Sequence, residues 1–129
     1  MVVDTSALIA VLLNEPEAPA IRTAFDHDDV RLLSAATLLE VAMVIEARKG
    51  DGGGRDLDLL ISKAKIEVVP VDAGQVEEAR RAWRRFGRGR HDAGLNYGDL
   101  FSYALSRSTG EPLLFKGGDF ARTDVARVI

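Results

Sequence analysis

The segment Val2-Val3-Asp4-Thr5-Ser6-Ala7-Leu8 carries the pattern from which the fold is predicted. Two adjacent β-branched residues are typical of a short buried strand, and the acid that follows them stands where such a strand ends. The apolar residues that come next predict a helix over residues 6–13. A buried strand that leads directly into a helix is characteristic of a parallel sheet, so the segment indicates an α/β fold.

The same alternation of strands and helices continues along the chain. A capping residue at Ser34 and a capping box of Asp72 with Gln75 mark the starts of two helices. Helices are predicted at residues 6–13, 16–25, 34–49, 56–65, 72–86 and 96–108, with a loop over the glycine-rich stretch 50–54. Strands are predicted at residues 2–3, 30–33, 68–69 and 113–115, with a last short strand at 128–129. The pattern predicts an α/β/α three-layer sandwich around a mostly parallel sheet of four to five strands.

Length and composition predict one domain over residues 1–129 with an apolar core, since 47% of the residues are hydrophobic. The chain has no cysteine, which excludes disulfides and thiolate chemistry. No secretory signal is present, and no apolar run approaches the roughly 20 residues of a membrane helix. We therefore expect a cytoplasmic protein. The net charge of −3 is unlike that of typical nucleic-acid binders, although acidic groups gathered in one site leave room for basic surfaces elsewhere.

Four acidic residues stand where a parallel α/β sheet binds its ligands, which is beyond the carboxyl ends of the strands. Asp4 follows the first strand, and Asp119 follows the predicted strand at 113–115. Asp99 begins an apolar helical stretch. Glu40 has apolar residues four before it and three and four after it, which predicts that it lies on a core-facing stripe. These four side chains are expected at one end of the sheet.

Each of these acids also has a local explanation. Asp4 could cap the helix that follows it, and Asp99 could form a capping box with Asn96. Asp119, which comes after two glycines, could be an ordinary turn residue. Glu40 could extend its carboxylate to water. The four together are the stronger signal, because each local explanation accounts for only one of them.

A cluster of carboxylates needs a compensating charge. Two unit charges about 4 Å apart repel by roughly 4 kcal/mol at an effective dielectric of about 20. The repulsion is relieved when some carboxylates take up protons or when a divalent cation binds among them. Ligands that are all carboxylate oxygens suit Mg²⁺ or Mn²⁺ rather than zinc. Such a site can promote in-line displacement at phosphorus, so the cluster predicts phosphodiester hydrolysis.

Four segments resemble the acidic motifs of PIN-domain ribonucleases, and specifically of VapC-type toxins from bacterial toxin–antitoxin pairs. The first is the opening segment around Asp4, and the second is Ser34-Ala35-Ala36-Thr37-Leu38-Leu39-Glu40. The third runs from Leu95 to Ala104 and contains Asp99. The fourth is Leu113-Leu114-Phe115-Lys116-Gly117-Gly118-Asp119-Phe120. Any one motif is a weak signal, but four in the family's order are specific, and together they extend through the chain.

This resemblance implies an Mg²⁺-dependent endoribonuclease, with Mn²⁺ as a possible substitute. Asp4, Glu40, Asp99 and Asp119 would form the metal site, with Asp4 and Asp99 as the most direct ligands. Thr5 and Ser6 would orient carboxylates or water. Many family members carry Thr or Ser after the fourth strand, where this chain has Phe115-Lys116, so Asp124 is an alternative to Asp119. The implied partners are RNA, a cognate VapB-type antitoxin and a second copy of the chain in a homodimer.

Arginines gather on the predicted helix 72–86 and just after it. They are expected to bind RNA phosphates, or else to form a solvated face balanced by Glu77 and Glu78. The candidates for RNA contacts are Arg81, Arg84, Arg85 and Arg88. Trp83 and Phe86, on the same helix, are predicted to belong to the core.

Two other functions compete with the nuclease. One is phosphotransfer on an aspartate, but haloacid-dehalogenase-like phosphatases place a second acid two residues after the nucleophile, where this chain has Ser6. The other is a carboxylate-rich module without catalytic activity, which would only dock a partner. Cleavage of RNA discriminates both from the nuclease.

Overall fold

Four parallel strands form a single sheet in the computed structural model, which describes all 129 residues. The sheet has the order β3-β2-β1-β4. Its strands are β1 (Val2–Val3), β2 (Leu32–Ser34), β3 (Glu67–Val69) and β4 (Leu113–Leu114). Val2 pairs with Leu32 on one side and Leu113 on the other, so β1 lies between strands that follow it in sequence. The strand order reverses at β1, which is where ligands bind in open parallel sheets.

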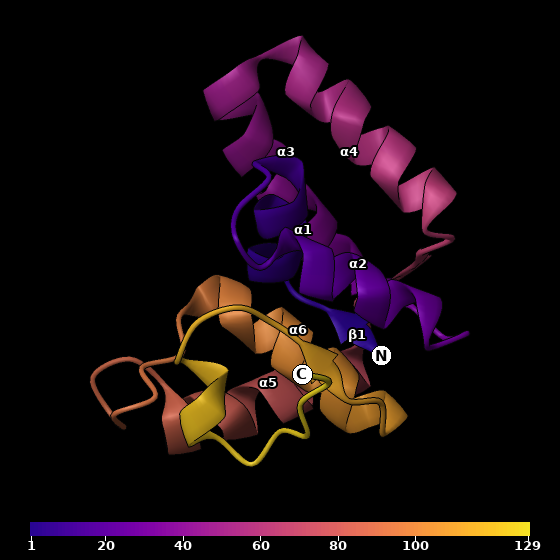
Figure 1. The fold of residues 1–129 in the computed structure, drawn as a ribbon. Coiled ribbons are helices and arrows are strands. Elements are labelled where there is room, and N and C mark those ends of the chain that lie inside the picture. The colour runs from indigo at the N-terminus through magenta and orange to yellow at the C-terminus, as the bar shows by residue number, and fades with distance from the viewer.

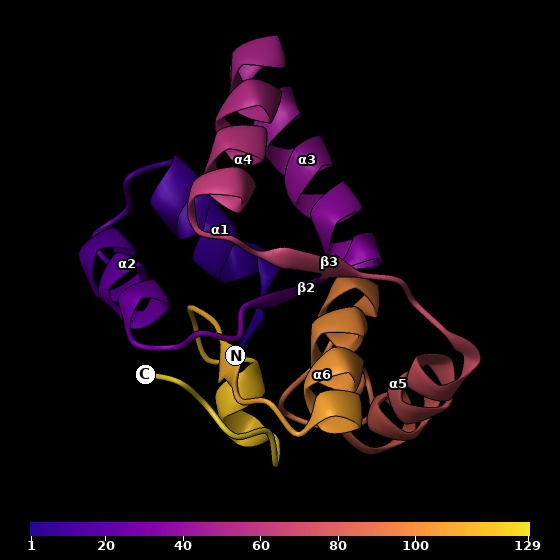
Figure 2. The same ribbon diagram turned by 90° about the vertical axis from the view of Figure 1, so that its right-hand side faces the viewer.

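Helices cover both faces of this sheet (Figures 1 and 2). One layer holds α1 (Thr5–Leu12), α2 (Ala18–Asp26), α3 (Ala35–Lys49) and α4 (Asp51–Lys63). The opposite layer holds α5 (Ala73–Phe86) and α6 (Tyr97–Thr109), and a 3₁₀ helix, η1, spans Phe120–Arg122. The predicted three-layer α/β/α sandwich with a parallel sheet is therefore confirmed. None of the helices is long and apolar enough to cross a membrane.

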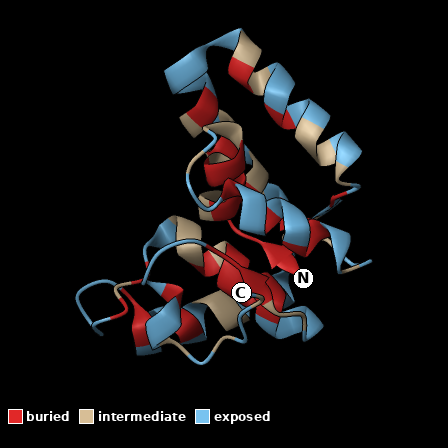
Figure 3. Cartoon of the chain, viewed as in Figure 1, coloured by how far each residue is buried: buried red, intermediate tan, exposed pale blue.

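The core consists of two apolar clusters, one on each face of the sheet. Because side chains alternate along a strand, Val3 packs against α1 to α4, whereas Val2 packs against α5 and α6. Leu114 and Leu113 divide between the two clusters in the same way. Figure 3 shows the buried residues on the faces of the helices that are turned inward. The short strands are thus buried on both faces, as their continuous apolar sequence predicts.

Two predicted elements were wrong. The glycine-rich stretch is not a loop, because α4 begins at Asp51 and includes Gly52, Gly53 and Gly54. A Cβ on Gly53 would lie 2.7 Å from the Ile45 carbonyl oxygen, so this glycine is needed where α4 packs closely on α3. The strand expected at 128–129 is reduced to one parallel bridge between Leu113 and Arg127, since β4 offers only two residues for pairing.

The capping predictions were partly right. Asp72 accepts a hydrogen bond from the Gln75 backbone N–H at 2.8 Å, but the Gln75 side chain donates to the Pro70 carbonyl instead of completing a capping box. Ser34 occupies the N-cap position of α3 without a capping hydrogen bond from its side chain. Its buried hydroxyl has no partner.

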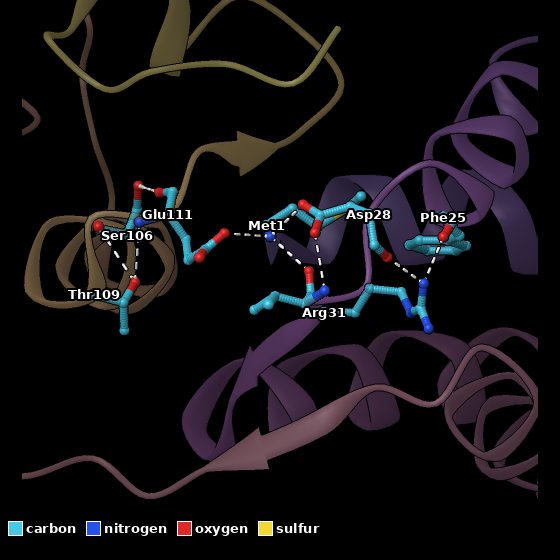
Figure 4. A network of polar contacts seen from close by, with 8 residues as sticks. Met1, Phe25, Asp28, Arg31, Ser106, Thr109 and Glu111 are labelled. Carbon is cyan, nitrogen blue, oxygen red and sulfur yellow. Dashed lines mark hydrogen bonds and ion pairs between the residues drawn. The ribbon is translucent and has the colours of Figure 1, made fainter.

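The amino group of Met1 lies at the centre of a polar network that joins three segments (Figure 4). It donates to the Asp28 carboxylate at 2.8 Å, the Glu111 carboxylate at 2.7 Å and the Val30 carbonyl oxygen at 2.6 Å. Met1 is fully buried, and the hydrogen bond from its ammonium group lowers the pKa of Asp28 below its usual value. The two carboxylates therefore compensate a charge that would be costly to bury alone.

We expect Asp28→Asn to lower the free energy of unfolding by about 1 to 2 kcal/mol at pH 7, because it weakens a charge-assisted hydrogen bond to a buried ammonium. A carboxyl whose pKa is lowered by folding stabilises the fold above its unfolded pKa and loses that effect as pH falls through its folded pKa. The difference between the variant and the wild type should therefore shrink in acid, below about pH 4. Urea unfolding at several pH values measures this difference in the free energy of unfolding, with Asp29→Asn, at an exposed position, as the matched control. Equal losses in both variants would contradict the role given to Asp28.

Candidate carboxylate site

Asp4 is held at the carboxyl end of β1, at the point where the strand order reverses. Its side chain is buried, with 3% of the residue exposed, and it caps α1. One carboxylate oxygen accepts hydrogen bonds from the Ser6 backbone N–H at 3.0 Å and the Ser6 hydroxyl at 2.7 Å. The other accepts from the Ser102 hydroxyl at 2.7 Å. Asp4 therefore caps α1 as predicted, and three donors together orient its carboxylate.

Ser102 is a site residue that the sequence analysis missed. It lies three residues after Asp99 on α6, so the two residues share one side of that helix, and this spacing is the signal that could have identified it. Its hydroxyl lies 3.3 Å from that of Thr37 on α3. Ser6 is similarly supported, because its hydroxyl accepts a hydrogen bond from the Lys116 backbone N–H at 2.9 Å. Hydroxyl groups thus link Asp4 to the segments that follow β2 and β4.

Glu40 lies on α3, half buried, and its carboxylate accepts a hydrogen bond from the Thr5 hydroxyl. The core-facing stripe predicted for it was wrong. Met43, on that stripe, is 64% exposed, whereas the stripe that packs into the core is made of Thr37, Val41 and Ile45. The Glu40 carboxylate instead rests against Gly98, where any Cβ would overlap it. Gly98 therefore lets α6 approach closely enough to leave room for this acid.

Asp99 both caps α6 and lies near the other predicted acids. It forms the capping box with Asn96, accepting from the Asn96 backbone N–H at 3.0 Å and donating its own backbone N–H to the Asn96 side chain at 2.9 Å. The pKa of Asp99 is raised to about 6, mainly by burial and further by the negative charges of Asp4, Asp119 and Glu40, against the opposing hydrogen bond from the Asn96 backbone. The four predicted acids therefore lie within one electrostatic neighbourhood.

Asp119 and its alternative, Asp124, lie in different surroundings. Asp119 is exposed at the N-cap position of η1 and contributes to the raised pKa of Asp99. Asp124 instead accepts hydrogen bonds from the Tyr103 hydroxyl and, at 2.9 Å, from the Arg85 guanidinium. Asp124 is thus neutralised by its own partners, while the charge of Asp119 acts on Asp99.

The donor set of this site suits a hard divalent cation, because every candidate ligand is a carboxylate oxygen. No three acidic or histidine side chains are gathered closely enough to form a ready-made cage for an ion. Mg²⁺ typically takes only one or two protein carboxylates and retains several waters, so its binding does not require such a cage. A cation at this site would meet an Asp4 carboxylate that is already oriented by hydrogen bonds and an Asp99 carboxyl whose pKa is raised.

The arginines that were predicted either to bind RNA phosphates or to form a solvated face lie in different surroundings. Arg81 pairs with Glu78 at 2.8 Å, and Arg85 pairs with Asp124 at 2.9 Å. Arg84 is exposed. Arg88 lies beyond the end of α5, so it does not share a helical face with the others, and it lines a groove between α5 and α6. The helix ends at Phe86 and is followed by Gly87, where a Cβ would overlap the Trp83 backbone.

The chain matches the PIN domain family over residues 1–126. Ribonuclease VapC30 of Mycobacterium tuberculosis is 55% identical over 128 residues, which cover 99% of this chain and 98% of that protein. Ribonuclease VapC of Mycolicibacterium smegmatis is 56% identical over 128 residues, which cover 99% of each chain. The matched region covers nearly the full length of both proteins.

Solved structures resemble the fold in the same way. VapC20 of Mycobacterium tuberculosis, described as a toxin that cleaves the sarcin-ricin loop, superposes with a TM-score of 0.78 at 20% identity, covering 97% of this chain and 95% of its own. VapBC2 from Rickettsia felis, solved with a DNA fragment from its promoter, gives a TM-score of 0.77 at 12% identity, covering 98% and 94%. Both likenesses establish the arrangement of helices and strands.

Proposed function

This chain belongs to the PIN-domain family and, within it, to the VapC ribonucleases, and on this premise we propose that it is a cytoplasmic, Mg²⁺-dependent endoribonuclease that acts as the toxin of a VapBC-type pair. The observation that carries the proposal is the meeting of Asp4, Glu40 and Asp99 at the carboxyl edge of the sheet, where Glu40 rests against Gly98 and Ser102 donates to Asp4. Acids from four separate segments converge on one place where a phosphodiester and a cation could meet.

In this proposal Asp4 and Asp99 are the most direct ligands of Mg²⁺, or of Mn²⁺ in its place, and Glu40 and Asp119 complete the site. A bound cation would lower the pKa of a coordinated water and offset the charge of the phosphodiester. The hydroxyls of Ser6 and Ser102 hold the two oxygens of Asp4.

Thr5 holds Glu40 against Gly98 by its hydroxyl hydrogen bond. Thr5, Ser6 and Ser102 are therefore positioning residues. They orient the carboxylates before a ligand arrives, which lowers the reorganisation that binding would require.

A cognate VapB-type antitoxin is the proposed inhibitor, and a homodimer is the proposed assembly. An antitoxin segment that placed an arginine side chain among the four acids would compete with Mg²⁺ for their negative charges and would block RNA from the site. The arginines Arg81, Arg84, Arg85 and Arg88 are proposed to contact RNA phosphates. Of these, Arg81 and Arg85 would first have to leave their carboxylate partners, so Arg84 and Arg88 should contribute more.

Incubation of the purified chain with bulk bacterial RNA tests the proposed function, with double-stranded DNA as the matched substrate. We expect RNA to be cut into fragments, DNA to stay intact, and a stoichiometric VapB-type antitoxin to stop the reaction. Intact RNA under all conditions would favour the inert docking module. Release of inorganic phosphate from small phosphate esters would favour phosphatase chemistry.

We expect Gly98→Ala to lower RNA cleavage by about 10-fold while changing the free energy of unfolding by less than about 1 kcal/mol. The added methyl group would displace the carboxylate of Glu40, a flexible side chain, from its place beside Thr5. Gly52→Ala is the matched control, because it is also a helical glycine and its Cβ would come no closer than 3.9 Å to another group. Cleavage and thermal unfolding are measured for both. Full activity in Gly98→Ala would show that the placement of Glu40 is unimportant.

A further inference from the structure

The segment of residues 116–125, which follows β4 and carries Asp119, is held on the fold by side-chain contacts (toward the yellow end of the colours in Figure 1). No backbone–backbone hydrogen bond joins residues 117–125 to another part of the chain. The only regular element in the segment is the short helix η1. The position of Asp119 therefore depends on the side chains that bind this segment to the helices and the sheet.

Asp124 joins the segment 116–125 to both α5 and α6. Its carboxylate accepts a hydrogen bond from the Tyr103 hydroxyl on α6 and another, at 2.9 Å, from the Arg85 guanidinium on α5. Arg107, also on α6, places a guanidinium nitrogen 3.9 Å from the same carboxylate. Polar groups from two helices thus converge on one acid of the segment.

The surroundings of Asp124 keep these contacts charge-assisted. Burial raises the pKa of Asp124, but the hydrogen bond from Tyr103 and the positive charges of Arg107 and Arg85 outweigh this effect and hold the pKa below its usual value. Asp124 is therefore ionised at neutral pH. Burial and the hydrogen bond to Asp124 raise the pKa of Tyr103, so the Tyr103 hydroxyl remains a donor over the same pH range.

The aromatic residues of α5 show which of its sides supports this network. Phe86 is buried as predicted and packs against Tyr103, with ring centroids 5.9 Å apart. Trp83 lines the groove on the other side of α5, together with Arg88, and is 44% exposed. The prediction that Trp83 belongs to the core was therefore wrong. The ring that holds the Tyr103 hydroxyl in place rests on the core through Phe86.

The pocket around this network has balanced charges. It has a volume of about 270 Å³, and its arginines face two acids, Glu78 and Asp124. Glu78 forms an ion pair at 2.8 Å with Arg81, which lies on the same helix. Asp124 is therefore the one acid of the pocket that connects the segment 116–125 to the helices, and its partners have a structural use without any ligand.

A short turn connects Asp124 to Asp119. Phe120, directly after Asp119, is 3% exposed and packs on Phe115, with ring centroids 5.2 Å apart. The Phe120 carbonyl oxygen accepts hydrogen bonds from the Thr123 backbone N–H at 3.0 Å and the Thr123 hydroxyl at 2.7 Å. One apolar contact leaves the turn free to rotate about the Phe120 ring. The contacts of Asp124 supply the second fixed point that prevents this rotation.

We propose that Asp124 is a positioning residue, whose contacts with α5 and α6 fix the turn that presents Asp119 to the cation site. The proposal rests on the proposed function, because it takes Asp119 as part of that site. The charge of Asp119 reaches the other acids, since it contributes to the raised pKa of Asp99. Asp124, which the sequence offered as an alternative ligand, thus acts on the site through Asp119.

The test titrates Mg²⁺ into the whole chain without RNA and measures binding by calorimetry. Asp124→Ala should weaken Mg²⁺ binding by about 10-fold, which is the lower end of the effect of losing a group that orients a metal ligand. Asp119→Asn should weaken binding at least as much. The double variant should bind Mg²⁺ no more weakly than Asp119→Asn alone, because Asp124 acts only through Asp119. Additive losses in the double variant would overturn the positioning role.

Glu78→Ala is the matched control, because it removes an ion-paired acid of the same pocket whose partner lies on its own helix. It should bind Mg²⁺ as the wild type does. Asp124→Asn can still accept the Tyr103 hydrogen bond but loses its charge, so its affinity should lie between those of Asp124→Ala and the wild type. Circular dichroism and thermal unfolding should show that every variant is folded.

Trypsin tests the attachment of the segment without any metal. Its cleavage sites within residues 116–125 follow Lys116 and Arg122. In EDTA, Asp124→Ala should be cut at these sites about 10-fold faster than the wild type, as expected when local opening no longer breaks a charge-assisted hydrogen bond. Glu78→Ala should be cut at the rate of the wild type. Mass spectrometry identifies the fragments.

The proposed function and the positioning role fail separately. A wild type that binds no Mg²⁺ would remove the metal site and, with it, the role of Asp124 at that site. Equal Mg²⁺ affinity in Asp124→Ala and the wild type, or equal rates of trypsin cleavage, would remove the positioning role and leave the metal-dependent nuclease intact.

Discussion

Replacement of Asp4 by Asn should lower RNA cleavage by at least about 100-fold, which is the scale of losing one preorganised charged group in an active site. The change removes one negative charge from a carboxylate that is buried and held by three donors. Asn has nearly the same shape, and its carbonyl oxygen can still accept from the Ser6 backbone N–H. The Ser6 hydroxyl can keep donating to the same oxygen, and the Ser102 hydroxyl can rotate to accept from the amide group. The fold should therefore persist without the charge.

Asp72→Asn is the matched control for this variant. Asp72 also caps a helix through its side chain, with a 2.8 Å hydrogen bond from the Gln75 backbone N–H, but it stands at the start of α5 after β3 and is not among the four site acids. RNA cleavage should be unchanged in Asp72→Asn, and both variants should keep the melting transition of a folded protein. Equal activity in Asp4→Asn and the wild type would move the chemistry away from this carboxylate.

Replacement of Asp99 by Asn should have two effects of opposite value: a loss of RNA cleavage of at least about 100-fold and a gain in stability. The pKa of Asp99 is about 6 in the folded chain, so its ionised form is disfavoured by folding at pH 7. A shift of this size corresponds to about 3 kcal/mol, which we reduce to about 1 to 2 kcal/mol because the side chain is partly exposed. Asn removes this cost and can keep the hydrogen bond to the Asn96 backbone N–H.

The pH dependence of stability identifies the cause. A carboxyl whose pKa is raised by folding contributes stability that is full below its unfolded pKa, about 3.8, and is lost as pH rises through about 6. In EDTA, the wild type should therefore lose stability between pH 4 and pH 6, relative to Asp99→Asn, and the gap should stay constant above that range. Urea unfolding at several pH values measures this, with Asp56→Asn on α4 as an exposed control. A variant less stable than the wild type at pH 7 would contradict the strained carboxylate.

The fold was largely predictable from the chain because its short strands are buried on both faces and read as uninterrupted apolar pairs such as Val2-Val3 and Leu113-Leu114. The beginning of α4 was not predictable, since three successive glycines normally indicate a loop. They form a helix here because Gly53 allows α4 to pack against the Ile45 backbone, which is a tertiary contact. The strand predicted at residues 128–129 was wrong for a related reason. Two apolar residues do not reveal how many residues of β4 are available for pairing.

The site was predictable in its acids and less so in its geometry. The positions of Asp4 and Asp119 follow from where strands end, which is a property of local sequence. The environment of Glu40 does not, because periodicity on α3 cannot distinguish a face that packs on the sheet from one that packs on α6. The pairing of Arg85 with Asp124 joins residues 39 positions apart in sequence and divides an arginine cluster that looks continuous on a helix. Such long-range contacts depend on the assembled layers.

The most direct test of the carboxylate site is cleavage of bulk bacterial RNA by wild-type chain that has been stripped of metal with EDTA and then given Mg²⁺. A site in which Asp4, Glu40, Asp99 and Asp119 hold a cation predicts no cleavage after stripping, full cleavage after Mg²⁺ is restored, and recovery with Mn²⁺. Cleavage that persists in EDTA at the rate of the untreated protein would contradict it, because the four acids alone offer neither a nucleophile nor a positive charge to an RNA phosphate.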